Sequence, residues 1–176
     1  MIATIRVQSE PFDVGVEIAG LSAGRTDIGG VGCFVGTVRG ADAPDGVTGM
    51  TLEHYPGMTE RAIRTIADDA AHRWPLLGVT IIHRIGRLVP GDPIVLVLAA
   101  SRHRDAALTA THFLIDWLKT RAPFWKQEHL SDGTSHWVDA RATDDAATAR
   151  WQSDPQSQNP LPLAGEGLGE GGSRKP

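Results

Sequence analysis

The sequence contains a single cysteine, Cys33, among its 176 residues. One thiol excludes an intrachain disulfide and a metal site built from cysteines alone. Long apolar runs are also absent, since no stretch approaches the roughly 18 to 20 apolar residues that a membrane-spanning helix needs. The N-terminal stretch MIATIRVQSE lacks the cationic start and the apolar segment of a secretory signal peptide. These absences favour a cytoplasmic protein without disulfides.

An excess of positive charge is missing as well. The chain has 17 Lys and Arg against 21 Asp and Glu, for a formal net charge of -4. This balance argues against bulk nucleic-acid binding, which usually accompanies a basic domain. The hydrophobic fraction of 41% and the charged fraction of 22% are those of a soluble globular protein. The length suits one domain, or one domain with a tail.

The periodicity of apolar residues predicts strands and helices in alternation. We expect strands over 2–7, 30–38, 50–54, 79–83 and 94–100, a short hairpin over 129–138, and helices over 11–21, 58–74, 104–121 and 141–151. The strand over 94–100, IVLVLAA, is continuously apolar, which is typical of a central strand covered on both faces. This order predicts a single-domain α+β fold with a mixed or antiparallel sheet and packed helices.

The strand expected over 30–38, GVGCFVGTV, carries Gly30, Gly32 and Gly36. This spacing is not G-x-G-x-x-G, and no helix clearly follows, so a dinucleotide fingerprint is not supported. Glycine inside a strand indicates that another group approaches the backbone closely. We expect the strand over 50–54 to pair back onto this one across the small-residue loop 40–49.

The composition changes from Ser153 onward. Nine of the residues from 153 to 176 are proline or glycine, and few are large and apolar. Such a segment cannot supply a core. The sequence therefore predicts a folded domain over 1–152 and a disordered tail over 153–176.

Positive charge gathers around the helix expected over 104–121. His103 and Arg104 stand at its start, where free N–H groups and the helix dipole favour anions. Lys119 lies in its last turn, and Lys126 follows the stop at Ala122-Pro123. Any single cation is more often a solvated surface residue, but this concentration on an acidic chain favours an anionic substrate.

The length of this helix constrains the site. Lys119 is 15 residues from Arg104, roughly 22 Å along the axis at about 1.5 Å per residue. Either the ligand is extended, or two copies of the chain combine opposite ends into one site, as in a symmetric dimer. Arg39, at the end of the glycine-rich strand, joins the same candidates. His83, His112 and His129 do not form a spaced metal motif.

Four blocks of the sequence closely resemble the large, catalytic subunit of molybdopterin synthase. They are LEHYPGMTE (52–60), HRIG (83–86), PGD (90–92) and LKTRAPFWK (118–126). The resemblance runs in order from about Pro11 to Trp151. It implies an α+β homodimer that binds two copies of a small ubiquitin-like sulfur-carrier subunit. The carrier's C-terminal Gly-Gly thiocarboxylate gives sulfur to cyclic pyranopterin monophosphate, which forms the dithiolene of molybdopterin. The large subunit needs no metal or cofactor.

The resemblance also implies a site, by matching motifs one by one. Lys119 and Lys126 are expected to be catalytic, and both are expected to contact substrate. The other expected substrate-binding residues are Thr37, Val38, Arg39, His103, Arg104, Gln127 and Glu128. The middle position of the K-x-E motif is usually basic in the family and is Gln127 here. This difference is expected to lower the affinity for substrate and to leave the role of the two lysines unchanged.

Three alternatives stay open. The first is a phosphate-ligand binding protein with the same fold, against which the intact pair Lys119 and Lys126 argues. The second is a sulfurtransferase that carries a persulfide on Cys33, although we expect this residue to be a small buried hydrophobe. The third is that Gly171-Gly172 imitates the carrier, but the sequence SRKP follows it, so a C-terminal thiocarboxylate would require cleavage.

Overall fold

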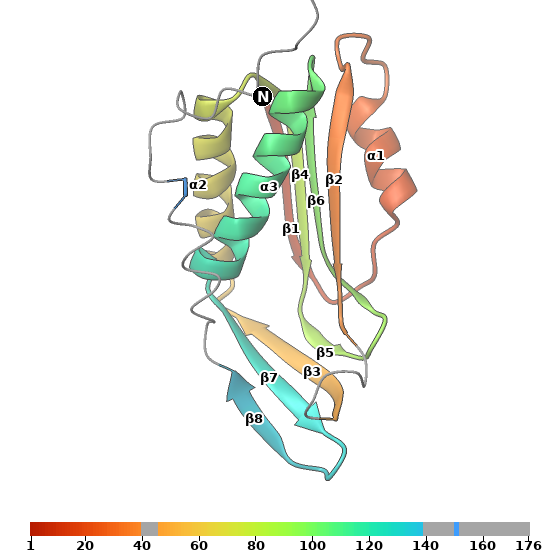
Figure 1. Cartoon of the computed structure of the whole chain (residues 1–176), viewed down its shortest axis with the longest axis vertical. Coiled ribbons are helices and arrows are strands. Elements are labelled where there is room, and N and C mark those ends of the chain that lie inside the picture. The colour runs from red at the N-terminus through yellow and green to blue at the C-terminus, as the bar shows by residue number, and fades with distance from the viewer. Residues whose placement is uncertain (40–45, 139–149, 152–176) are drawn as a thin grey trace, which may run out of the picture.

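The computed structural model describes residues 1–39, 46–138 and 150–151. Within these ranges the chain forms two four-stranded sheets and three helices (Figure 1). The helices are α1 (Val14–Ser22), α2 (Met58–Arg73) and α3 (Arg104–Arg121). Sheet A has the order β1 (Ile2–Gln8), β4 (Leu76–Arg84), β6 (Pro93–Ser101) and β2 (Gly30–Thr37). Sheet B has the order β5 (Gly86–Leu88), β3 (Val47–His54), β7 (Phe124–Leu130) and β8 (Ser135–Val138).

The pairing confirms the predicted α+β class. In sheet A, β1 is parallel to β4, while the β4–β6 and β6–β2 pairs are antiparallel. Sheet B is antiparallel throughout. The expected single sheet is thus two sheets, one mixed and one antiparallel.

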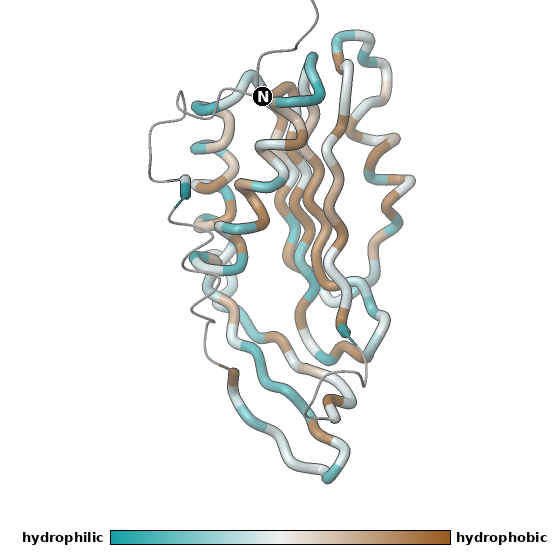
Figure 2. The backbone as a smooth tube through the Cα atoms, viewed as in Figure 1, coloured by the Kyte–Doolittle hydropathy of each residue, from teal (hydrophilic) through white to brown (hydrophobic). Residues whose placement is uncertain are grey.

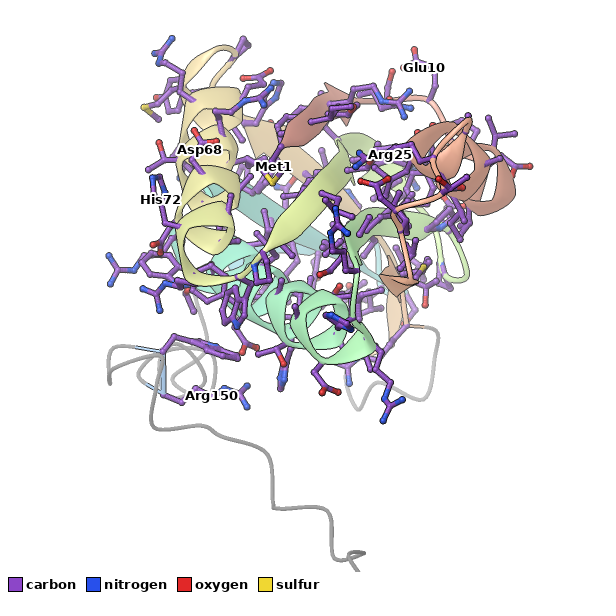
Figure 3. The ribbon with its side chains drawn as sticks, turned by 90° about the horizontal axis from the view of Figure 1, so that it is seen from above. Met1, Glu10, Arg25, Asp68, His72 and Arg150 are labelled. Atoms are coloured by element: carbon purple, nitrogen blue, oxygen red, sulfur yellow. The ribbon has the colours of Figure 1, made fainter. Side chains whose placement is uncertain are left out.

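Sheet A is covered on both faces. Helices α2 and α3 lie over one face and α1 over the other (Figures 1 and 3). The first face packs Ile63 and Phe113 of the helices against Val97, and the second packs Leu21 of α1 against the face that carries Leu98. Strand β6 is buried from residue 95 to 101, as its continuous apolar sequence predicts, and Figure 2 shows the strands of this sheet mainly in brown.

The glycines of β2 bring α3 down onto the strand. A Cβ at Gly32 would lie 2.5 Å from the carbonyl oxygen of Ala107 and closer still to the hydroxyl of Thr111. A Cβ at Gly29 would collide with the carbonyl oxygen of Arg102, just before the helix. The close approach predicted from the glycine pattern is therefore confirmed, and the approaching group is the backbone of α3.

The prediction that residues 50–54 pair with the glycine-rich strand was wrong. Strand β2 pairs with β6, whereas β3 lies between β5 and β7 in sheet B. The inner face of β3 buries Met50 and Leu52 in a small core of their own, with Val38 and Leu88. A strand's own pattern shows which face is buried but does not identify its neighbour.

Sheet B also contains a longer hairpin than expected. Its first strand begins at Phe124 rather than at His129, so the aromatic and lysine residues after Pro123 belong to β7. The turn lies at Asp132-Gly133, as predicted, with Gly133 at a φ of 84°. The helix expected over 141–151 and the tail over 153–176 lie outside the described residues, apart from positions 150 and 151. None of the described helices is long and apolar enough to cross a membrane.

The short segment Arg150–Trp151 closes the core over α3. The indole N–H of Trp151 donates to Oδ2 of Asp116 at 2.8 Å, and Nη2 of Arg150 donates to the same oxygen at 2.7 Å. Nη1 of Arg73 donates to the carbonyl oxygen of Trp151 at 2.8 Å. The indole is only 7% exposed and meets the ring of Phe113 edge-on at 5.5 Å. Figure 3 shows Arg150 beside the layer of α2 and α3.

Trp151→Ala should lower the free energy of unfolding by about 3 to 5 kcal/mol, because it removes a large buried ring and an indole hydrogen bond. Trp137→Ala is the matched control, since Trp137 is 52% exposed, and should cost less than about 1 kcal/mol. Urea denaturation followed by circular dichroism measures both. Equal losses in the two variants would contradict this role of Trp151.

Candidate active site

An open hollow of about 320 Å³ lies between β2 and α3. Lys119, in the last turn of α3, is exposed and lines it. The other lining residues are Cys33, Phe34, Leu108, Thr111, His112, Ile115 and Asp116. The hollow therefore combines a lysine, a histidine and a carboxylate with apolar walls, which suits a ligand that is partly charged and partly flat and apolar.

Lys126 is held by a neighbouring carboxylate on β7. Its Nζ donates to Oε1 of Glu128 at 2.8 Å, and the two side chains are 30% and 15% exposed. Residues two apart in a strand point to the same face, so the pair shares one side of sheet B. Gln127 points to the other face, where its Nε2 donates to Oγ of Ser135 at 3.2 Å. The ammonium group of Lys126 is thus oriented before any substrate binds.

The first residue of β7 is anchored to sheet A. The ring of Phe124 stacks on the imidazole of His83 in β4, with centroids 3.8 Å apart and planes 19° from parallel. Burial lowers the pKa of His83 from 6.5 to about 4, so the ring is neutral at physiological pH. A neutral imidazole can stack on Phe124 without a desolvated charge. This contact fixes the point from which Lys126 extends.

Thr37 is the last residue of β2, and Val38 and Arg39 follow it at the end of sheet A that adjoins sheet B. The strand runs from Gly30, opposite Ser101, to Thr37, opposite Pro93. Val38 is 3% exposed, and its N–H donates to the carbonyl oxygen of Asp92 at 2.9 Å. The side chain of Val38 packs in the small core of sheet B, while Thr37 and Arg39 on either side are exposed.

His103 and Arg104 lie at the start of α3, at the opposite end of sheet A from Arg39. His103 is the N-cap of α3 but makes no side-chain cap bond. The side chain of Arg104 is 83% exposed, and its Nε is 3.8 Å from a carboxylate oxygen of Asp105. Figure 1 shows α3 running from this end down to sheet B. Within one chain, the structure therefore brings Arg39, Lys119 and Lys126 to one end of sheet A and leaves His103 and Arg104 at the other.

Cys33 is not the buried hydrophobe that we expected, because the structure shows it exposed. Strand β2 is an edge strand of sheet A, so an apolar sequence there does not guarantee burial. Cys33 is among the residues that line the hollow, but it pairs with Leu98, so its side chain points to the α1 face of sheet A and away from Lys119. Partial burial nevertheless raises the pKa of Cys33, which disfavours the thiolate that a persulfide carrier needs.

Sequence reasoning missed two polar groups of the hollow, His112 and Asp116. They lie seven and three residues before Lys119, a spacing that places them on its helix face, and that spacing was the available signal. His112 Nε2 is 3.6 Å from Oδ2 of Asp116, which also accepts from Trp151. Within 1–39, 46–138 and 150–151, no three His, Cys, Asp or Glu side chains are grouped so that they could hold a metal ion.

The chain is thus an α+β protein in which Lys119 lines an open hollow and Lys126 lies on the strand that follows the same helix. The family model described as "MoaE protein" matches residues 7–121. The chain belongs to the MoaE family.

Close relatives support this membership. The molybdopterin synthase catalytic subunit of Ralstonia nicotianae is 55% identical over 148 residues, which cover 84% of each chain. The solved MoaE protein of Burkholderia ambifaria is 52% identical with a TM-score of 0.74, covering 87% of this chain and 100% of that one. A complex of subunits 1 and 2 of the molybdopterin-converting factor from Helicobacter pylori shares the fold, with a TM-score of 0.63 at 18% identity, covering 80% of this chain and 92% of that one.

Family and relatives agree on the kind of enzyme. The chain is of the class of molybdopterin synthase catalytic subunits, which transfer sulfur in the biosynthesis of the molybdenum cofactor.

The neutral His83 predicts a pH dependence of stability. In the unfolded chain the imidazole takes up a proton near pH 6.5, but in the folded chain only near pH 4. Between these values the unfolded state binds more protons, so stability falls as the pH falls, by up to about 3 kcal/mol. Urea denaturation from pH 7 to 4 measures this loss. His83→Phe should reduce the slope across this window, and an unchanged slope would count against the assignment.

Proposed function

We propose that the chain transfers sulfur from the C-terminal thiocarboxylate of a small carrier subunit to cyclic pyranopterin monophosphate, forming the dithiolene of molybdopterin. The observation that carries the proposal is the placement of Lys119 on α3 and Lys126 on β7 at the end of sheet A where β2 delivers Arg39. The donor is a thiocarboxylate and the acceptor a phosphate. Fixed positive charge lowers the cost of bringing two anions together.

The chemistry needs no oxidant or reductant. In each transfer, one oxygen of the pterin side chain is exchanged for sulfur, and the carrier leaves as a carboxylate. A C–S bond forms on the pterin as the C–O bond that it replaces breaks, and the displaced oxygen leaves as water or on the phosphate. Water attacks the acyl carbon of the carrier as the acyl C–S bond breaks, which gives the carboxylate. The groups required are cations that polarise the acyl oxygen and groups that move protons, and lysines can do both.

The structure suggests different roles for the two lysines. Lys119 is exposed in the hollow and is our candidate for the group closest to the reacting carbons. Lys126 is pre-oriented by Glu128, so we assign it to orienting and polarising the thiocarboxylate. Arg39 is suited to bidentate contact with the phosphate. Thr37, Val38 and Gln127 stay proposed substrate contacts, Val38 through its backbone because its side chain is buried.

A homodimer would explain how His103 and Arg104 can belong to the same site as Lys119. One small ligand cannot reach both ends of α3, which are about 22 Å apart by helix geometry. In a two-fold symmetric dimer, the helix start of one chain can lie beside the helix end of the other. We therefore propose that His103 and Arg104 of one protomer hold the pterin phosphate near Lys119 of its partner.

The proposed carrier is a small ubiquitin-like subunit with a C-terminal Gly-Gly. The molybdopterin-converting factor of Helicobacter pylori, whose subunits 1 and 2 form a complex, supports such a partnership. A glycine-ended tail is slender enough to enter an open hollow of this volume. A cytoplasmic location is part of the same proposal, as is a domain that ends at about residue 152.

Lys119→Ala should lower the single-turnover rate of dithiolene formation by about 100-fold or more, the range expected when a proton-transfer group is lost. The purified chain is mixed with thiocarboxylated carrier and the cyclic pterin, and the product is followed by mass. Near-normal turnover in Lys119→Ala, together with loss in Arg39→Ala, would show the roles to be misassigned. No product from the parent chain, despite a stable complex with the carrier, would favour the binding-protein alternative.

Cys33→Ser tests the persulfide alternative in the same experiment, because it removes the thiol and nearly keeps the size of the side chain. It should retain turnover within about threefold of the parent, less than 1 kcal/mol in the barrier. A loss comparable with that of Lys119→Ala would instead favour the persulfide mechanism.

Mixing two inactive variants tests the shared site. His103→Ala and Lys119→Ala protomers, exchanged into heterodimers, should recover part of the activity, because one of the two sites then has all its residues intact. Up to about half of the heterodimer sites can be restored. Exchange is verified by native mass spectrometry, and verified heterodimers without recovery would rule out the shared site.

A further inference from the structure

Thr59 is a fully buried polar residue that joins three segments of the chain. It lies in the first turn of α2 and is 0% exposed. Its hydroxyl donates to the carbonyl oxygen of Pro123 at 3.2 Å and accepts from the backbone N–H of Tyr55 at 3.2 Å. The donor and acceptor capacities of this hydroxyl therefore connect α2 to the end of β3 and to the corner between α3 and β7.

The start of α2 is itself held firmly. Gly57, with a φ of 78°, is the N-cap, and its N–H donates to Oε2 of Glu60 at 2.6 Å. The N–H of Thr59 donates to the carbonyl oxygen of Tyr55 at 3.0 Å. Thr59 thus makes reciprocal hydrogen bonds with Tyr55. The two hydrogen bonds of its hydroxyl therefore hold the Thr59 side chain in one orientation.

The corner between α3 and β7, to which Thr59 is hydrogen-bonded, separates Lys119 from Lys126. Pro123 lies four residues after Lys119 and three residues before Lys126. On one side, α3 rests on the backbone of β2 at Gly32. On the other, Phe124 stacks on His83 of β4. Both lysine-bearing elements are therefore anchored to sheet A, and the angle between them depends on the corner.

We infer that Thr59 is a positioning residue for sulfur transfer: its hydroxyl holds the Pro123 corner and thereby keeps Lys126 in place relative to Lys119. The inference rests on the proposed function. Thr59 does not touch the hollow and acts only through the backbone. Reacting groups displaced by about 1 Å can lose about 100-fold in rate, so a small rotation at this corner has a large effect.

The test compares Thr59→Val, which keeps the shape and removes the hydroxyl, with Thr59→Ser, which keeps the hydroxyl. Thr59→Val should lower the single-turnover rate at saturating pterin by about tenfold, with half-saturation changed less than about twofold. Thr59→Ser should recover to within about threefold. Thr65→Val is the matched control: Thr65 is exposed on the same helix, its hydroxyl donates to the carbonyl oxygen of Arg61, and its loss should leave the rate unchanged.

Amide hydrogen exchange provides a readout that does not depend on activity. Exchange over residues 124–128 should rise about tenfold in Thr59→Val but not in Thr59→Ser, while the middle of α3 stays protected. Should Thr59→Val not fold, Thr59→Ala carries the same comparison with less steric demand.

Three results would overturn the inference: parent-like rate and exchange in Thr59→Val, a change confined to half-saturation, or a Thr59→Ser variant as slow as Thr59→Val. A parent chain that makes no product would overturn the proposed function. The exchange data would still show whether Thr59 holds the corner, so the two failures can be told apart.

Discussion

The contact between α3 and the backbone of β2 is the constraint on which the rest of the site depends. Gly32 has no side chain, so the helix rests against the strand at Ala107 and Thr111. This contact sets the path of α3 along sheet A, and the hollow beside it is bounded by the same two elements. The position of Lys119 is therefore determined by a glycine 87 positions earlier in the chain that has no functional group of its own.

The sequence predicted α1, α2, α3 and the central strand because each carries its own periodic signal. Helix α2 begins at Met58 and β6 is buried on both faces, as their patterns indicate. The pairing of β3 and the start of β7 were not predictable in the same way, because the partner of a strand is chosen by packing between segments far apart in the chain. Cys33 illustrates the same limit: its apolar neighbours indicated burial, but edge position decides exposure.

The residues of the candidate site were also only partly predictable from the sequence. Lysines and arginines at helix ends stand out in a sequence, and motif resemblance adds the remaining positions. Asp116 and His112 did not stand out, because a carboxylate inside a helix is usually solvated, whereas here Asp116 accepts from the indole of Trp151. Thr59 also gave no signal in the sequence, since a threonine after a turn is ordinary and its hydrogen-bond partner at Pro123 is 64 residues away.

Because Trp151 closes the core from near the end of the described residues, a premature stop codon shortly before it has a particular consequence. Every candidate site residue, from Thr37 to Glu128, is translated before Trp151. A chain cut short by a premature stop codon between these points keeps the whole set of cations, yet it leaves the rings of Trp74 and Phe113 without their cover. Exposed aromatic surface is what chaperones and proteases act on in incomplete domains. Cellular quality control, rather than missing chemistry, then decides the fate of such a truncated product.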